Sequence, residues 1–218
     1  MNFFDCQASA RWKALAVVTG TDSTVLLTDV VGFGALHRSC LDRQVIRSEG
    51  LQIMRSTLGP LWGECISQDR GDGLFIVAPP AVPTAQIMTC LHQRLPARLR
   101  EHNQEHEEPT RIRLRVAANI GRVVVDAMGL SGEAILRADR LVEAPVMRQA
   151  MAESGASLGI MASESASEKV TGPAAGVTGA GEYVKVAVTN KEFRGSGWLR
   201  LVDPSPRAPV ALRAAPPG

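Results

Sequence analysis

Short apolar runs alternate along the chain with longer segments in which apolar residues recur every three or four positions. The run at 25–27 is bounded by Thr and Asp residues and predicts a strand over 24–29. After glycines at 32 and 34, helical spacing predicts a helix over 35–58, which Gly59-Pro60 ends. Strand-like runs at 62–68 and 74–78 flank Arg70-Gly71-Asp72-Gly73, a sequence typical of a hairpin.

The second half of the chain continues this alternation. Helices are predicted over 83–103, over 132–152 with Ser131 as the cap, and over 163–170. Strands are predicted over 111–119, 123–125, 158–161, 183–188 and 198–202, with Lys191 in the turn between the last two. This order predicts an α+β fold, with one mainly antiparallel sheet and helices packed on a face. The arginines of 111–119 alternate with apolar residues, and we interpret them as a solvated face in preference to a phosphate contact.

Composition narrows the class of protein. The chain has 218 residues, 45% of them hydrophobic, and a net charge of +2, which fits one globular domain and argues against broad nucleic-acid binding. No signal peptide or membrane-spanning run is recognisable, and the four cysteines lack metal-site spacing, so we expect a cytoplasmic protein with reduced thiols that binds no membrane. We expect a lead-in at 1–22, a domain at 23–202 and a disordered Pro/Ala-rich tail at 203–218.

Two aspartates are the candidates for chemistry. Asp29 ends a predicted strand and precedes a Gly-bearing turn and a helix N-terminus, an arrangement that suits phosphate. A carboxylate beside phosphate requires a cation between them, so the pattern indicates a divalent metal. Asp72, between glycines in the predicted hairpin, would supply a second carboxylate. The alternative is that Asp29 is a turn former or helix cap and Asp72 belongs to an ordinary hairpin.

Four motifs, in order, give the chain a resemblance to a known family. They are Thr28-Asp29-Val30-Val31-Gly32-Phe33, Gly71-Asp72-Gly73, the segment from Arg115 to Gly121, and the segment from Gly132 to Leu141. Residues 23–202 resemble the catalytic domain of class III nucleotide cyclases. The resemblance implies an α+β, ferredoxin-like catalytic domain that forms a 3′,5′-cyclic nucleotide and pyrophosphate from a nucleoside triphosphate.

The resemblance also implies roles for particular residues. Asp29, Asp72 and the carbonyl of Val30 would hold two Mg²⁺ or Mn²⁺ ions. Backbone N–H groups of the turn would cradle the phosphates, and Arg140 and Lys191 would stabilise charge on them. The turn comprises Val31, Gly32, Phe33 and Gly34. In this family the metal-binding and basic residues come from opposite subunits, which implies a symmetric homodimer with two sites at the interface.

Three positions depart from the family pattern. Leu136 replaces the ribose-contacting Asn, Gln68 replaces the adenine-reading Lys, and Gly129 stands near the position of its partner Asp. Gln68 is a candidate base reader or a plain strand residue, with Asp69 and Arg70 as rivals. The loss of purine readers makes the chain most similar to the pyrimidine cyclases of bacterial Pycsar anti-phage systems. These make cyclic UMP or cyclic CMP for a separate effector.

Two alternatives stay open at this point. One is an adenylate cyclase with an atypical base pocket. The other is a cyclase-like domain that binds nucleotide or a partner without catalysis, which Leu136 favours while Asp29, Asp72 and Arg140 favour an active enzyme.

Overall fold

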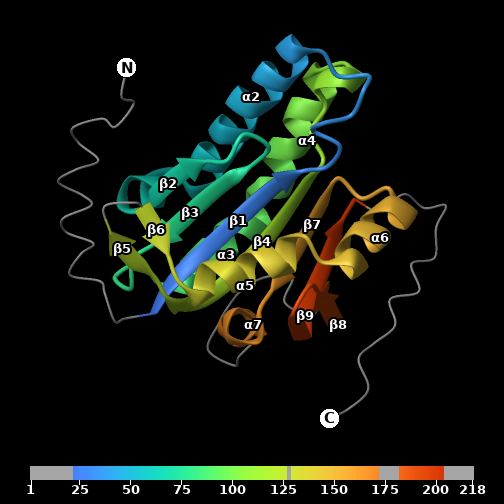
Figure 1. Cartoon of the computed structure of the whole chain (residues 1–218). Helices are drawn as coiled ribbons and strands as arrows, with labels where there is room; N and C mark the ends of the chain where they lie inside the picture. Colours follow the sequence, from blue (N-terminus) through green and yellow to red (C-terminus); the bar gives the residue numbers. More distant parts are fainter. Residues whose placement is uncertain (1–21, 127–128, 172–181, 204–218) are drawn as a thin grey trace.

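The computed structural model describes residues 22–126, 129–171 and 182–203. A seven-stranded sheet runs through the molecule in the order β2-β3-β1-β4-β7-β9-β8, and all of its pairings are antiparallel except β4 with β7 (Figure 1). The mainly antiparallel α+β prediction is therefore confirmed. The predicted lead-in, apart from Asp22, and the predicted tail, apart from Asp203, lie outside the described residues.

The strands of the sheet are β1 (Asp22–Val30), β2 (Ile66–Asp69), β3 (Leu74–Ala78), β4 (Leu114–Arg122), β7 (Leu158–Ala162), β8 (Val184–Asn190) and β9 (Phe193–Val202). The helices are α2 (Cys40–Leu58), α3 (Thr84–Gln93), α4 (Leu95–Glu105), α5 (Glu133–Val142), α6 (Pro145–Ser154) and α7 (Glu164–Thr171), with 3₁₀ turns at Gly59–Glu64 and Glu108–Thr110. Within the described ranges, no helix is both long and apolar enough to cross a membrane.

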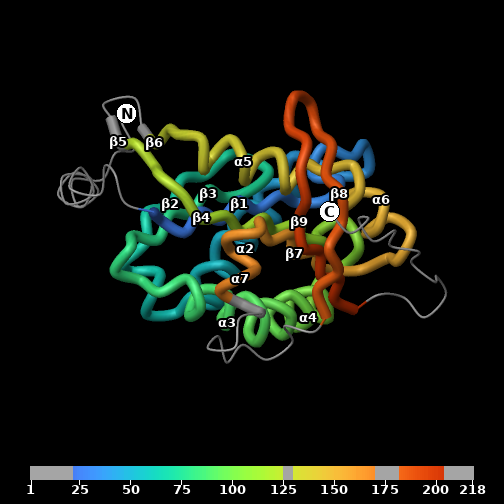
Figure 2. The backbone as a smooth tube through the Cα atoms, turned by 90° about the horizontal axis from the view of Figure 1, so that it is seen from below, coloured from blue at the N-terminus to red at the C-terminus, as the bar shows by residue number. Residues whose placement is uncertain are grey.

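Both faces of the sheet are covered, and β1 contributes to both cores. Leu26 and Val30 pack with Ile46 of α2 on one face, whereas Val25 and Leu27 pack with side chains of α5 and α6 on the other. Figure 2 shows the sheet between α3 and α4 on one side and α5 and α6 on the other. This double burial explains why β1 reads as a continuous apolar run.

The helix predicted over 35–58 begins later than expected. It starts at Cys40, because Ser39 is its N-cap and Asp42 completes a capping box. The Asp42 N–H donates to the Ser39 hydroxyl, and the Ser39 N–H donates to the Asp42 carboxylate at 2.7 Å. The residues after Asp29 therefore form a turn of their own, and the N-terminus of α2 is capped by its own side chains. Its end at Leu58, with Gly59 as the cap, is confirmed.

Two predicted long helices are each divided in two by proline. The helix over 83–103 is interrupted at Arg94, because Pro96 cannot donate to the carbonyl of residue 92 and its ring would clash with that group. The helix over 132–152 is interrupted at Ala144, whose ψ of 127° lies outside the helical region because the residue precedes Pro145. The helix predicted to end at residue 103 continues slightly further, because α4 ends at Glu105.

Three smaller predictions are also corrected. The first three residues of the strand predicted over 62–68 belong to a 3₁₀ turn, since Gly59-Pro60 opens a tight helical turn, and β2 begins only at Ile66. The strand predicted over 123–125 does not pair back onto the main sheet. It forms β5 (Val124–Asp126), which pairs with β6 (Gly129–Ser131) in a separate two-stranded ribbon. Ser131 lies in that ribbon, so the N-cap position of α5 falls to Gly132.

Candidate active site

The end of β1 and the β2–β3 turn bring Asp29 and Asp72 together. The Val30 N–H donates to the carbonyl of Asp72 at 2.8 Å, and the Leu74 N–H donates to the Thr28 hydroxyl at 2.8 Å. Gly73 permits this approach, because a Cβ at that position would lie 1.9 Å from the Thr28 carbonyl oxygen. The two aspartates predicted from the sequence are thus neighbours at the C-terminal end of β1.

Asp29 is partly buried and carries an opposite charge beside it. Arg115, its cross-strand partner on β4, donates to Asp29 Oδ2 through Nε at 2.8 Å and also through Nη2. Burial raises the pKa of Asp29 and the nearby Asp72 charge raises it further, while Arg115 opposes both effects. Additional positive charge beside Asp29 would favour its ionised form.

These donors fit a Mg²⁺ ion that is bound jointly with a phosphate ligand. Mg²⁺ prefers oxygen ligands and is commonly held by one or two carboxylates together with waters and substrate phosphates. Asp29 and Asp72 supply two carboxylates, and Val30 a backbone carbonyl. Over the described part of the chain, no cluster of three or more His, Cys, Asp or Glu side chains forms a complete metal cage. Two carboxylates and one carbonyl leave positions in the Mg²⁺ shell for phosphate oxygens and waters.

A hollow of about 380 Å³ lies beside Asp29, and we call it the arginine pocket. It is lined by Val31, Gly32, Arg113, Arg115 and Arg148, with Met151 and Ala152 behind them. The solvated face predicted for the arginines of 111–119 is therefore wrong for Arg113 and Arg115, because Arg113 donates to the backbone at the end of α6 and Arg115 pairs with Asp29. Three guanidinium groups around one hollow favour an anionic ligand.

The three arginines differ in their contacts. Arg113 donates through Nε to the Ala156 carbonyl at 3.1 Å and through Nη2 to the Met151 carbonyl at 2.6 Å, so it anchors the end of α6. Arg115 is held by Asp29. Arg148 is exposed on α6, and its charge is near enough to lower the pKa of Asp29. Arg148 is thus the arginine of this pocket best placed to meet a ligand from solvent.

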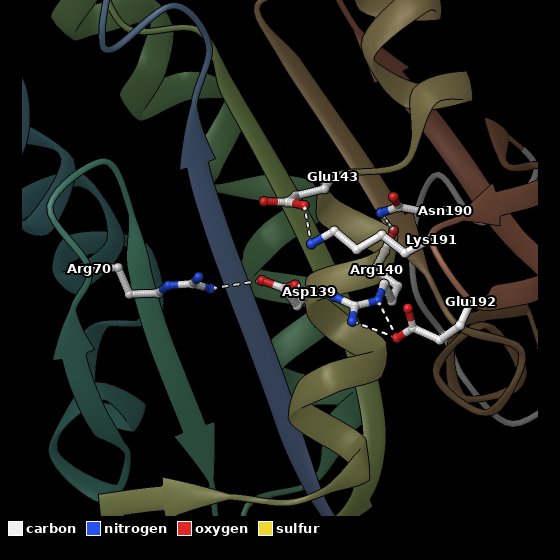
Figure 3. A network of polar contacts seen from close by, with 7 residues as sticks. All are labelled: Arg70, Asp139, Arg140, Glu143, Asn190, Lys191 and Glu192. Carbon is white, nitrogen blue, oxygen red and sulfur yellow. Dashed lines mark hydrogen bonds and ion pairs between the residues drawn. The ribbon is translucent and has the colours of Figure 1, made fainter.

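Arg140 and Lys191 form a second cluster, at the C-terminal end of α5 and in the β8–β9 turn (Figure 3). Arg140 donates to Glu192 Oε1 through Nε at 3.0 Å and Nη2 at 2.6 Å, and to Asp139 through Nη1 at 2.8 Å. Lys191 Nζ lies 3.6 Å from a carboxylate oxygen of Glu143. The structure therefore brings together the two basic residues that the sequence proposed, although they are about fifty positions apart.

No protein-family model matches this chain, and no curated protein matches its sequence. Solved structures do match it. The guanylyl cyclase Cya2 aligns with a TM-score of 0.58 at 15% identity, over 89% of this chain and 97% of that one. The guanylate cyclase domain of RhGC from Catenaria anguillulae, solved with GTP, aligns with a TM-score of 0.54 at 18% identity, over 84% of this chain and 98% of that one. A bacterial light-regulated adenylyl cyclase aligns with a TM-score of 0.54 at 10% identity, over 82% of this chain and 88% of that one.

The chain has the class III nucleotide cyclase fold. At these identities the similarity establishes the fold, and the chemistry has to be argued from the side chains. Within this cyclase fold, Asp139 connects the two clusters described above. Its carboxylate accepts from Arg140 and also from Arg70 Nη1 at 3.2 Å, and Arg70 lies in the turn that carries Asp72 (Figure 3).

The turn at 31–34 offers fewer free N–H groups than expected. The Val31 N–H donates to the Arg113 carbonyl at 2.9 Å, and the Phe33 N–H donates to the Val30 carbonyl at 3.2 Å. Phosphate binding by this turn would therefore fall to the N–H groups of Gly32 and Gly34. Gly32, with φ of +68°, adopts a left-handed conformation that favours glycine.

The proposed base readers lie on the β2–β3 side of the cyclase fold. Gln68 is exposed on β2, whereas Asp69 is paired with Arg47 at 2.5 Å and Arg70 with Asp139. Leu136, at the position of the family's ribose-contacting Asn, is 57% exposed on α5. Of these three candidate base readers, Gln68 thus has the side chain that is freest to contact a base.

Arg148 was not among the residues predicted from the sequence, because no local pattern connects α6 with the end of β1.

Proposed function

We propose that this protein is a nucleotide cyclase that converts a nucleoside triphosphate into a 3′,5′-cyclic nucleotide and pyrophosphate. The observation that carries the proposal is the pair of interacting carboxylates, Asp29 and Asp72, beside a pocket lined by three arginines. A carboxylate pair next to a cationic hollow suits a metal-bound polyphosphate, and the fold is that of nucleotide cyclases.

In the proposed reaction the ribose 3′-hydroxyl gives its proton to solvent, the 3′-oxygen bonds to the α-phosphorus, and the bond from the α-phosphorus to the leaving pyrophosphate oxygen breaks. Two Mg²⁺ or Mn²⁺ ions, held by Asp29, Asp72 and the Val30 carbonyl, would lower the pKa of the 3′-hydroxyl and neutralise phosphate charge. Gly32 and Gly34 would bind the terminal phosphates through their N–H groups. Arg115 and Arg148 would contact the same phosphates.

Arg140 and Lys191 would stabilise the charge that builds on the phosphates during attack. A guanidinium fork matches two phosphate oxygens, and a Lys adds a point charge. We further propose that these residues act on the nucleotide bound at the partner's aspartates, so that a symmetric homodimer holds two shared sites. A catalytic cation supplied across an interface makes each chain inactive alone.

The proposed substrate is a pyrimidine nucleotide, UTP before CTP, with cyclic UMP as the expected product. Gln68 and Gly129 replace the Lys and Asp that read a purine in similar cyclases, and a Gln side chain can both donate to and accept from a pyrimidine edge. A role of this product as a messenger for a separate effector in antiviral defence rests on the resemblance to Pycsar cyclases.

A cyclase-like domain that binds nucleotide without turning it over is the second candidate. Leu136 supports it, because this exposed side chain cannot hydrogen-bond a ribose.

Incubation of the purified protein with each of the four nucleoside triphosphates and Mn²⁺ tests both candidates. We expect a cyclic nucleotide, identified by mass, with UTP giving the most. Asp72→Ala should lower the rate by at least about 100-fold, because the metal-held activation of the 3′-hydroxyl is lost. Asp203→Asn, an exposed carboxylate paired with Arg100, is the matched control and should retain activity. Nucleotide binding without any product would favour the second candidate.

A further inference from the structure

The β8–β9 turn docks onto the last turn of α5 through three consecutive residues, Asn190, Lys191 and Glu192. Asn190 Nδ2 donates to the backbone carbonyl of Arg140 at 2.9 Å. Lys191 has φ of +53°, a conformation that side-chain-bearing residues rarely adopt and that reverses the chain at this point. The turn is therefore fixed against the helix by its backbone shape and by side-chain hydrogen bonds.

The ion pairs between these two elements are reciprocal. The cation of the helix, Arg140, pairs with Glu192 of the turn, and the cation of the turn, Lys191, pairs with Glu143 at the helix end (Figure 3). Each element thus neutralises the basic residue of the other. Both cations that the proposed reaction needs are already matched with carboxylates in the free chain.

The side chains of Arg140 and Glu192 differ strongly in exposure and in the number of groups that hold them. The side chain of Arg140 is 14% exposed, and Asp139 also holds its Nη1. The side chain of Glu192 is 74% exposed. The guanidinium is consequently the fixed partner, and the carboxylate is the one that solvent or a ligand can replace. Carboxylate and phosphate bind an arginine fork in the same way, through N–H groups that point at anionic oxygens.

We propose that Glu192 is a positioning residue that holds the Arg140 fork in place and yields it to a phosphate of the nucleotide. The inference rests on the proposed function, which assigns Arg140 to phosphate. Glu192 has two effects in this arrangement: its oxygen orients the fork, and its charge competes with the incoming anion. Removal of the charge alone should therefore strengthen anion binding, whereas removal of the whole side chain should also release the fork.

Calorimetric titration of the full-length protein with tripolyphosphate and Mg²⁺ separates these effects. Glu192→Gln keeps an acceptor but loses the competing charge, so we expect about two- to fivefold tighter binding, the range of an exposed ion pair. Glu192→Ala loses both, and its affinity should fall below that of Glu192→Gln. Unchanged or weaker binding by Glu192→Gln, or equal affinities of the two variants, would overturn the inference.

Two further variants keep the inference separate from the proposed function. Glu164→Gln removes an exposed carboxylate that pairs with Lys185 on another part of the fold, and its affinity should equal that of the wild type. Arg140→Ala should weaken binding. Wild-type affinity in Arg140→Ala would contradict the proposed function itself. Weakened binding in Arg140→Ala without any gain in Glu192→Gln would contradict only the role of Glu192.

Discussion

His92 is a buried residue whose ionisation should control stability in mild acid. Its Nε2 lies 2.7 Å from the Tyr183 hydroxyl, and burial, together with the charge of Arg200, lowers its pKa from 6.5 to about 4. The unfolded chain therefore binds a proton that the folded chain does not between these two values. We expect the free energy of unfolding to fall as the pH drops from about 6.5 to about 4, by at most about 3 kcal/mol.

Urea unfolding at a series of pH values would measure this loss. His92→Gln cannot take up the proton, so its unfolding free energy should vary less over the same range. His37→Gln, in an exposed loop, is the control and should keep the wild-type slope. A wild-type slope in His92→Gln would show that another group causes the acid sensitivity.

The β2–β3 hairpin is the element on which the aspartate pair depends, and Gly73 is the position that lets it approach β1. A Cβ there would overlap the Thr28 carbonyl oxygen, which is fixed by the strand. We expect Gly73→Ala to lower the free energy of unfolding by about 2 kcal/mol or more and to reduce cyclic product, because the turn must move away from Asp29. Thermal unfolding and a product assay measure the two effects.

Gly50 is a matched control glycine, at which substitution by alanine should raise stability and not lower it. It lies inside α2, and a Cβ there would have no heavy atom within 4 Å apart from its own chain neighbours and the backbone of its own helix. Gly50→Ala should stabilise the protein by about 0.5–1 kcal/mol, because alanine loses less conformational freedom in a helix. A Gly73→Ala variant as stable as the wild type would mean that the hairpin tolerates a shift without cost.

The whole molecule is expected to work as a dimer whose sites combine two chains. Asp72→Ala and Arg140→Ala should each be inactive alone, yet each mixed dimer would contain one complete site out of two. Since half of randomly mixed dimers are heterodimers, an equal mixture should recover about one quarter of the wild-type activity. The measurement is the rate of cyclic product formation after the two variants are mixed and allowed to exchange subunits.

Absence of recovery, with subunit exchange confirmed by mass, would place Asp72 and Arg140 in the same chain's site. Light scattering supplies an independent check, because a wild-type protein that is active while monomeric would contradict the shared site. These outcomes decide the assembly without depending on which nucleotide is the substrate of the proposed reaction.

The sequence by itself determined the features that depend on local physics. Apolar runs set β1 and β3, the glycines around Asp72 set the hairpin, and Lys191 was placed in its turn. The apolar spacing did not show the effect of proline on helix length. Pro96 and Pro145 each divide a segment whose apolar residues keep helical spacing across the interruption. The start of α2 was also wrong, because the Ser39 capping box outweighs the apolar spacing before it.

Only the tertiary structure decided which distant side chains meet. The arginine pocket exists because α6 places Arg148 beside Arg113 and Arg115, near Asp29, and the Arg140–Glu192 pair exists because the β8–β9 turn docks on α5. Local patterns fix which elements form, since their hydrogen bonds and caps lie within a few residues. Charge pairing between elements depends on how the cores of both sheet faces pack, and that packing is a property of the whole chain.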